Sequence, residues 1–281
     1  MRHKKLLAVL VCLFIGLAGA FACPSCAGPI PVPASVTRDN VRMYHDSRAD
    51  VTFWFSAPNR VSVYNSIWSE RSDLRKSGTY RFAYEYGTPF IHFYWDAHTS
   101  PRTIRERFLI LRNEHFMFLY NDNTNPAFRA RHGFLEPVPV HSVRASSTLT
   151  LGHLHFAATP DRLGAHINRV WAAEGGVGER LYIERVANWP LVMSIGYVHY
   201  SRPYLFKANA RPKRIRIASA HNEARFFEVE LEDTPHYQTI HLSERGLPNS
   251  IIIEILEIRP GFRYNHMCVN SVMWLSDNDA P

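Results

Sequence analysis

Apolar and polar residues alternate with a period of two along most of the chain, which is the spacing of side chains on one face of a β-strand. Residues 79–86 show this clearly, because Tyr80, Phe82, Tyr84 and Tyr86 fall on one face. We expect a half-buried strand there, and further strands at residues 50–55, 60–64, 90–95, 107–111 and 115–120. Short strands separated by turn residues predict a small antiparallel β-domain, as a sheet or partial barrel, over residues 41–135.

The second half continues the β pattern after a segment rich in turn formers and prolines. Residues 121–126 favour turns, and residues 136–140 hold two prolines and are expected to be extended, so we place a domain boundary near residue 140. Eight more strands are expected at residues 147–151, 181–185, 191–200, 213–218, 227–232, 237–242, 250–258 and 267–275. They predict a jelly-roll β-sandwich over residues 141–281, so the whole chain is predicted to be all-β.

The N-terminus has the features of a secretory signal peptide. Residues 1–5 are cationic, residues 6–22 form an uncharged apolar run, and residues 20–22 fit an A-x-A cleavage site. Residues 1–22 are therefore expected to be removed on export, and the apolar run is at the short end for a membrane anchor. We predict a protein of the periplasm or cell envelope, in which residues 23–40 form a linker that contains several prolines.

Cys23 directly follows the expected cleavage site, and three fates are open to it. Lipidation would anchor the protein, although Ala20 stands where lipoprotein signals normally have a bulky aliphatic residue. A Cys23–Cys26 disulfide would suit an oxidising compartment, and a redox C-x-x-C site is the third alternative. Lipidation of Cys23 would leave Cys26 and Cys268 as a possible pair.

Charge restricts the classes of partner. Loss of residues 1–22 lowers the formal net charge from +7 to +4, because three basic and no acidic side chains are removed. This mild and dispersed basicity is compatible with an anionic glycan or a phospholipid headgroup. Nucleic acid is not expected as a partner, because an exported protein rarely meets it.

Several blocks of the second half occur in the order found in one family. The first are residues 144–150 and the W-x-x-E-G-x-x-G-E block of residues 171–179. The later blocks are residues 195–197, 207–213, 226–238, 258–261 and 268–272. The second of these contains an N-x-R at Asn209 and Arg211, and the third contains Asp233, Thr234 and Gln238. Together these blocks resemble the discoidin-like, NADase-type glycan-binding domain, a galactose-binding-type β-sandwich of exported bacterial proteins, over about residues 144–276. Residues 108–120 are similar to the small β-domain that precedes this module in some spirochaete envelope proteins.

The resemblance implies a non-catalytic domain that recognises carbohydrate. It does not imply NAD hydrolysis, because the enzyme part of such proteins is a separate domain. Family members usually have an acidic turn shortly before the tryptophan, whereas this chain has residues 162–168 there and only Asp161 as a nearby acid. Calcium prefers several carboxylate and carbonyl oxygens, so we predict neither a metal ion nor a cofactor.

Carbohydrate sites combine an aromatic platform for the sugar ring with polar side chains for its hydroxyl groups. The candidates are Trp171, Tyr200 and Tyr204 for the platform, and Glu174, Glu179, Asn209 and Arg211 for the polar groups. Two structural alternatives remain open. Trp171 is a core residue in one, and Glu179 pairs with Arg211 to hold the glycine-rich loop in the other.

Other chemistry is less well supported by the sequence. Glu174 and Glu179 raise the alternative of a glycosidase, which needs two carboxylates at a set separation. The spacing of His92, Asp96 and His98 is not a standard zinc arrangement. His153 and His155 lie two residues apart but lack a third ligand nearby. The sequence has no G-x-S-x-G, Walker or H-E-x-x-H motif.

We therefore predict an exported envelope protein without enzymatic activity, which recognises a glycan or another envelope component through its C-terminal β-sandwich. The alternative is an envelope protein–protein adaptor that uses the aromatic N-terminal sheet as its surface. A glycan-processing hydrolase is a third hypothesis. Contact with a membrane is expected only through a lipid on Cys23.

Overall fold

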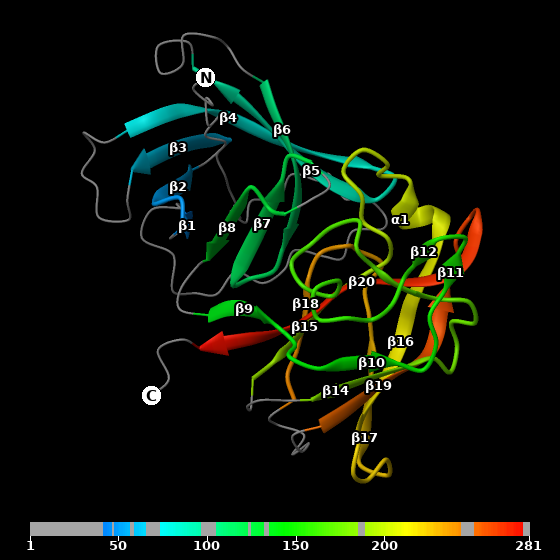
Figure 1. Ribbon diagram of the computed structural model, residues 1–281. Coiled ribbons are helices and arrows are strands. Elements are labelled where there is room, and N and C mark those ends of the chain that lie inside the picture. Colours follow the sequence, from blue (N-terminus) through cyan, green and yellow to red (C-terminus); the bar gives the residue numbers. More distant parts are fainter. Residues whose placement is uncertain are drawn as a thin grey trace.

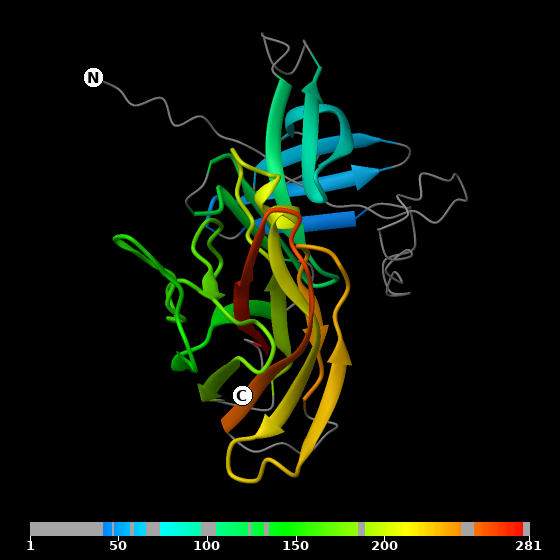
Figure 2. The same ribbon diagram turned by 90° about the vertical axis from the view of Figure 1, so that its right-hand side faces the viewer.

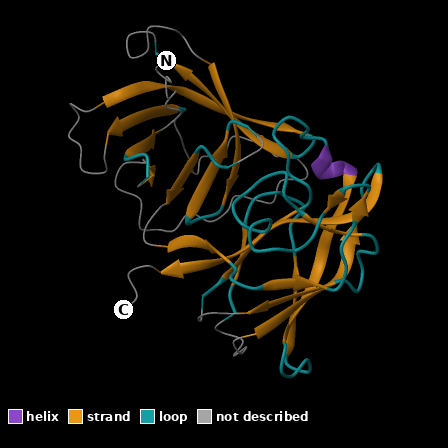
Figure 3. Cartoon of the chain, in the orientation of Figure 1, coloured by secondary structure: helices purple, strands orange, loops and turns teal. Residues whose placement is uncertain are grey.

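The computed structural model describes residues 42–46, 48–56, 59–65, 74–96, 105–122, 125–131, 135–184, 189–242 and 250–277. The predicted signal peptide, the linker, Cys23, Cys26 and His98 lie outside these residues. Apart from one short helix, the regular secondary structure of the described residues is β-strand, which confirms the predicted all-β class (Figure 3). It contains no helix that is long and apolar enough to cross a membrane.

The N-terminal half forms a closed barrel of eight antiparallel strands, each paired with the next in sequence (Figure 1). These strands are β1 (Arg42–Asp46), β2 (Val51–Ser56), β3 (Arg60–Asn65), β4 (Leu74–Glu85), β5 (Thr88–Trp95), β6 (Arg105–Arg112), β7 (Phe116–Tyr120) and β8 (Phe128–Arg131). The barrel closes where His45 of β1 pairs with Arg131 of β8. The six strands expected between residues 50 and 120 are present, whereas β1 and β8 were not expected.

The barrel interior is filled by aromatic and aliphatic side chains at alternate positions, as the period-two pattern predicts. Among them Phe93 stacks on Trp95, with ring centroids 5.1 Å apart. The prediction that the four aromatics of residues 79–86 lie on a buried face is wrong for all but Tyr80. β3 pairs with β4 only as far as Thr79. The side chains of β4 beyond Tyr80 therefore have no β3 neighbours and are more exposed.

The C-terminal half forms a 10-stranded sheet that folds over into two layers. Its strands are β9 (Leu135–Pro139), β10 (Val143–Ala145), β13 (Trp171–Ala173), β14 (Arg180–Glu184), β15 (Leu191–Ile195), β16 (Asn209–Ser219), β17 (Phe226–Glu230), β18 (Gln238–Ile240), β19 (Ser250–Arg259) and β20 (Tyr264–Asp277). The ribbon β11 (Thr150–Leu151) and β12 (Leu154–His155) and the helix α1 (Leu205–Ala208) lie outside this sheet.

The two layers of the sandwich are joined by β16. In the outer layer, β16 pairs with β17 and β19, and β19 continues to β14 and β10. In the other layer, here called the barrel-side layer, β20 pairs with β9, β13 and β15, and the start of β16 runs parallel to it. Side chains from both layers fill the core between them, among them Met193 and Ile215. This confirms the predicted sandwich architecture.

Three segments differ from the sequence-based expectation. Residues 135–139 are a strand that pairs with β20 rather than a free proline-rich connection. An extended edge strand tolerates proline because one of its sides needs no N–H donors. Residues 171–173 form β13, which was not among the expected strands, and of residues 147–151 only the last two are strand.

Figure 2 shows the barrel next to the sandwich. The two pack together through a buried apolar contact, here called the junction core. On the barrel side it consists of outward-facing residues of β5, β6 and β7, and on the sandwich side of residues from β15, β20 and the loops. Its fully buried members include Phe90, Leu109, Val192 and Met273. Tyr120 donates a buried hydrogen bond across it to the carbonyl oxygen of Ala165, at 2.9 Å. The two halves therefore share a buried apolar interior at the junction core.

Replacing Met273 by alanine is expected to lower the free energy of unfolding by about 2–5 kcal/mol, because the change leaves a cavity in the junction core. Barrel and sandwich are expected to unfold in a single transition, followed by near-UV circular dichroism in a urea titration. Met43→Ala is the control, because Met43 is 36% exposed; its effect should stay within about 0.5 kcal/mol. Two separate transitions, of which Met273→Ala moves only one, would contradict the shared interior.

Candidate functional site

Trp171 lies in the sandwich core and has no exposed surface. It belongs to β13, which pairs with β20, and its indole Nε1 donates a hydrogen bond to the carbonyl oxygen of Ser147 at 3.0 Å. A ring in this position is a packing element and has no face free for a sugar. The structure thus agrees with the core alternative for Trp171, and the aromatic platform must be sought elsewhere.

The glycine-rich loop after Trp171 makes a tight corner. Gly176 has φ +87°, and a side chain there would meet Ile258 and Met267 at 3.3 Å, so only glycine lets this loop lie flat on the sandwich. Glu174 is exposed on the loop. The Glu179 carboxylate accepts a hydrogen bond from the hydroxyl group of Ser146. Glu179 therefore ties the loop to the segment after β10.

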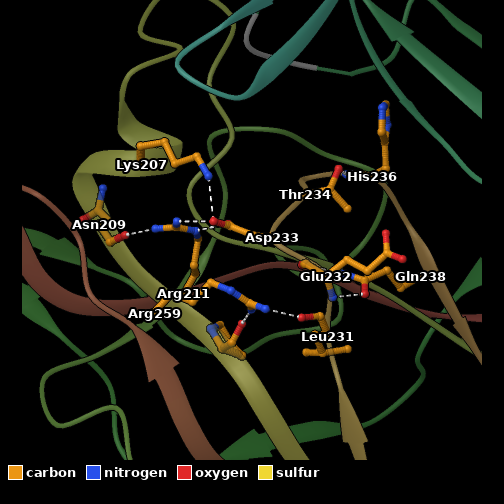
Figure 4. Close-up of polar contacts among 11 residues, drawn as sticks. Lys207, Asn209, Arg211, Leu231, Glu232, Asp233, Thr234, His236, Gln238 and Arg259 are labelled. Carbon is orange, nitrogen blue, oxygen red and sulfur yellow. Dashed lines mark hydrogen bonds and ion pairs between the residues drawn. The ribbon is translucent and has the colours of Figure 1, made fainter. Parts of the chain in front are cut away.

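In the structure, Arg211 pairs with Asp233 and not with Glu179, the partner in one of the two structural alternatives. Arg211, 5% exposed, donates from Nε and Nη2 to the two carboxylate oxygens of Asp233, at 2.6 and 2.8 Å (Figure 4). Lys207 of α1 donates to the same carboxylate at 2.7 Å. Asn209 is buried, and its side-chain amide donates to the carbonyl oxygen of Leu205. Asn209 therefore secures the end of α1, and Lys207 and Arg211 hold Asp233 from two sides.

The loop that bears Asp233, between β17 and β18, is held at both ends by polar contacts. Arg259 donates to the carbonyl oxygens of Leu231 and Pro212, at 2.6 and 3.1 Å. On the other side, the side-chain oxygen of Gln238 accepts the backbone N–H of Glu232 at 2.7 Å. Figure 4 shows these contacts together with the ion pairs of Asp233. Asp233 is thereby fixed in place while a quarter of its side chain stays exposed.

The charge of Asp233 is stabilised by its two cationic partners. Burial alone would raise the pKa of this carboxyl group, but the hydrogen bonds from Arg211 and Lys207 outweigh it and lower the pKa to about 2. Asp233 therefore remains ionised at any physiological pH. Its role was missed from the sequence, although Asp233 lies in one of the blocks that carry the family resemblance.

Arg211 is positioned by packing as well as by charge. Its guanidinium lies 5.1 Å from the centroid of the Phe206 ring. The ring fits there because Gly196 has φ +81° and no side chain, and a Cβ atom would lie 2.6 Å from it. Gly196 follows an irregularity in the pairing of β15 with β20, where the register shifts between Ser194 and Ile195.

Exposed aromatic rings lie beside this cluster, where the β4–β5 turn of the barrel meets α1. Gly87 of the turn packs against Lys207 and Phe206, and Tyr86 lies edge-to-face with Tyr204, with ring centroids 6.3 Å apart. Tyr86 is 63% exposed and Tyr204 is half-buried. We define the junction site as five residues: Tyr86, Tyr204, Lys207, Arg211 and Asp233.

The junction site continues onto β4 as a row of exposed rings. Phe82 and Tyr84 share one face of β4, and Tyr86 follows in the β4–β5 turn; the three residues are 36%, 47% and 63% exposed. Successive rings on one strand face are separated by roughly 7 Å. Tyr200 does not extend this row, because its hydroxyl donates to the carbonyl oxygen of Arg107 at 3.1 Å and its ring packs on Phe90. Tyr200 is therefore a contact between the two halves.

The metal-ligand candidates do not come together. His92 accepts hydrogen bonds from Arg105, and Asp96 pairs with Arg60 at 2.7 Å. The second candidate pair, His153 and His155, lies at the β11–β12 ribbon, where His155 contacts Thr150. Among the residues that the structure describes, no group of three or more His, Cys, Asp or Glu side chains is placed to hold a metal ion.

Cys268 is buried on β20, and burial raises the pKa of its thiol to about 12. A buried thiol with so high a pKa is a poor nucleophile for disulfide exchange. Cys268 packs in a layer with Leu149, Val170 and Ala172, and its pairing with Cys26 stays a prediction because Cys26 lies outside the described residues.

Comparison with known proteins leaves the family open. No protein-family model matches the chain. No curated protein matches its sequence. The fold itself, an all-β chain with a sandwich-like C-terminal half, is compatible with a galactose-binding-like domain.

The Asp233 ion pairs predict a loss of stability in acid. Because the folded-state pKa of about 2 is below the usual value of 3.8, the contribution of Asp233 is complete above that usual value and is lost as the pH falls towards 2. The shift corresponds to about 2 kcal/mol. We expect Asp233→Asn to destabilise the protein at neutral pH and the difference from wild type to shrink by about that amount near pH 2, measured by urea unfolding.

Asp161→Asn is the matched control for this measurement. Asp161 pairs with Arg169 at 2.6 Å, but its side chain is 65% exposed. A pair so open to solvent contributes at most about 1 kcal/mol. Equal pH profiles for Asp233→Asn and wild type would contradict the assignment of the acid-sensitive stability to Asp233.

Proposed function

We propose that this protein is an exported, non-catalytic envelope protein that binds carbohydrate at the junction site. The observation that supports it is the position of two tyrosine rings, Tyr86 and Tyr204, beside a partly exposed carboxylate that Lys207 and Arg211 hold in place. Aromatic faces pack against the C–H faces of sugars, and fixed charged groups exchange hydrogen bonds with their hydroxyls. The junction site has both in one place.

The polar groups of the junction site retain capacity for a ligand. An ionised carboxylate has about four acceptor positions, and Asp233 uses three of them for Arg211 and Lys207. The Lys207 ammonium group has three N–H donors, of which one is used for Asp233. A sugar hydroxyl both donates and accepts, so it matches a site that offers an acceptor next to a donor. Because the loop is already fixed, little ordering would be needed on binding.

The family resemblance supports the same site. Two of its blocks, residues 207–213 and 226–238, are separated in sequence, and the Lys207, Arg211 and Asp233 side chains of these blocks meet in space. In this proposal, residues 144–276 are a discoidin-like, NADase-type glycan-binding domain. The barrel adds the Tyr86 ring and the row on β4. Export by residues 1–22 and anchoring through Cys23 remain part of the proposal.

A glycan array probed with the full chain tests this proposal, followed by affinity measurements on the glycans that bind. We expect Tyr86→Ala and Tyr204→Ala each to weaken binding by about tenfold, since each removes a stacking surface. Thermal unfolding should change little for Tyr86→Ala, because this ring is mainly exposed. Tyr182→Ala, a half-exposed tyrosine of the outer layer, is the control. Binding that all three variants retain would place the glycan site elsewhere.

A protein–protein adaptor is the second candidate, favoured by the exposed rings of Phe82, Tyr84 and Tyr86. Aromatic residues are enriched in the centres of protein interfaces. If the array is empty and a defined envelope protein co-purifies with wild type but not with Phe82→Ser, the row is a protein-binding surface. Turnover of a chromogenic glycoside that Glu179→Gln abolishes would instead identify a glycan-processing hydrolase.

A further inference from the structure

A second cluster, on the outer surface of the barrel, brings basic side chains from three strands together. The strand register places Arg81 of β4 opposite His92 of β5, and His92 opposite Arg107 of β6. In the next row, Tyr94 of β5 lies opposite Arg105 of β6. Side chains opposite one another on the same face of a sheet are about 5 Å apart at Cβ. We call these five residues the arginine patch.

Tyr94 and His92 orient two of the guanidinium groups. Arg81 and Arg105 each lie 5.7 Å from the centroid of the Tyr94 ring. Arg105 also donates to His92 Nδ1, from Nε at 3.2 Å and from Nη2 at 3.0 Å. Cation–π contacts of this kind hold a guanidinium in place without neutralising its charge. The charges are thus positioned and remain available.

His92 contributes a neutral hydrogen-bond donor. Its Nδ1 accepts from Arg105, so in the neutral imidazole the proton is on Nε2. Burial lowers the pKa of His92, and the charges of Arg105, Arg81 and Arg107 lower it further, while Glu85 acts in the opposite direction. The histidine therefore stays uncharged beside three arginines.

The acids around the arginine patch do not neutralise it. Glu85 pairs with Arg107 at 2.8 Å. Among the described residues, neither Arg81 nor Arg105 forms an ion pair with a carboxylate. Arg107 in addition covers Phe90, with its guanidinium 3.6 Å from the ring centroid, at the edge of the junction core. Two exposed arginines beside a third thus remain without an acidic partner.

The outer layer of the sandwich offers a comparison, because its basic residues also lie on a sheet surface but are paired with acids. Its cations and acids alternate across β14, β19, β16 and β17 in one connected series of ion pairs. The pairs join Arg180 to Glu223 and Glu254, Arg216 to Glu254 and Glu228, Arg214 to Glu228 and Glu257, and Lys213 to Glu257. The arginine patch has the opposite character, because like charges converge there at an electrostatic cost.

We propose that the arginine patch binds the phosphate group of a ligand. A tetrahedral phosphate offers several oxygens to the two guanidinium forks of Arg81 and Arg105 and to the Nε2–H of His92. A carboxylate has only two oxygens, so it would leave donors of these three side chains unused. Arginine is the residue best suited to phosphate, because its planar fork donates two parallel hydrogen bonds. This site lies on the barrel and does not depend on the carbohydrate proposal.

Titration calorimetry of inorganic phosphate into the full chain, in a phosphate-free buffer of low ionic strength, tests the proposal. Arg81→Gln and Arg105→Gln should each weaken phosphate binding by about tenfold. Arg81→Lys should give a smaller loss, because lysine keeps the charge and loses the fork. The imidazole NMR resonances of His92 should shift when phosphate is added to wild type. Both arginines are exposed, so melting temperatures should remain close to that of wild type.

Arg144→Gln is the matched control, because the Arg144 guanidinium lies 4.1 Å from the Tyr182 ring on the sandwich. Unchanged phosphate affinity in Arg81→Gln and Arg105→Gln, or an equal loss in Arg144→Gln, would overturn the proposal. So would the absence of phosphate binding together with the absence of vesicle binding.

Vesicles of phosphatidylcholine, with and without phosphatidylglycerol, distinguish the sources of the phosphate group. Binding only to the mixed vesicles, lost in the Arg81→Gln/Arg105→Gln double variant, supports the site and identifies a lipid headgroup. Binding of inorganic phosphate without vesicle binding supports the site and identifies a soluble phosphate ester or a phosphorylated polymer.

Discussion

The rest of the structure depends on the apolar contact between the outer wall of the barrel and the barrel-side layer of the sandwich. Where the two halves meet, β6 is buried on both faces over residues 108–111 and β7 over residues 116–120, because one face fills the barrel and the other meets the sandwich. Their sequences accordingly read as near-continuous apolar runs, such as residues 108–111 and 116–120. Without the sandwich, Leu109 and Phe118 would face water. The barrel–sandwich arrangement is thus encoded in the barrel strands themselves.

This contact also creates the surface on which the proposed function depends. Because the barrel is fixed on the sandwich, the Tyr86–Gly87 turn lies against α1, and Thr88 adds a hydrogen bond to the carbonyl oxygen of Pro203 at 2.9 Å. The tyrosine pair therefore has one member from each half of the chain. A site of this kind exists only in the assembled protein, and sites at domain interfaces are common for this reason.

The sequence was sufficient to predict most of the longer strands and the all-β class, because period-two alternation depends only on local burial. It was insufficient wherever burial depends on a distant strand. Trp171 resembles a ligand-stacking residue until its side chain is seen to lie in the core between the two layers of the sandwich. Tyr84 and Tyr86 resemble core residues until β3 is found to end before them. Asp233 could be recognised as part of a family block, but its pairing with Arg211 links separate segments of the sandwich and has no local signature.

Structural and ligand-binding roles need not compete at the junction site. Arg211 is almost fully buried, and its carboxylate partner satisfies it there, since an unpaired guanidinium in that position would be costly. Asp233 in turn reaches the surface only because Arg211 and the loop contacts fix its direction. The structural ion pair thus sets the position of the exposed oxygen that a ligand would meet. The order of the site comes from the fold, and the exposed rings of Tyr86 and Tyr204 determine what it can recognise.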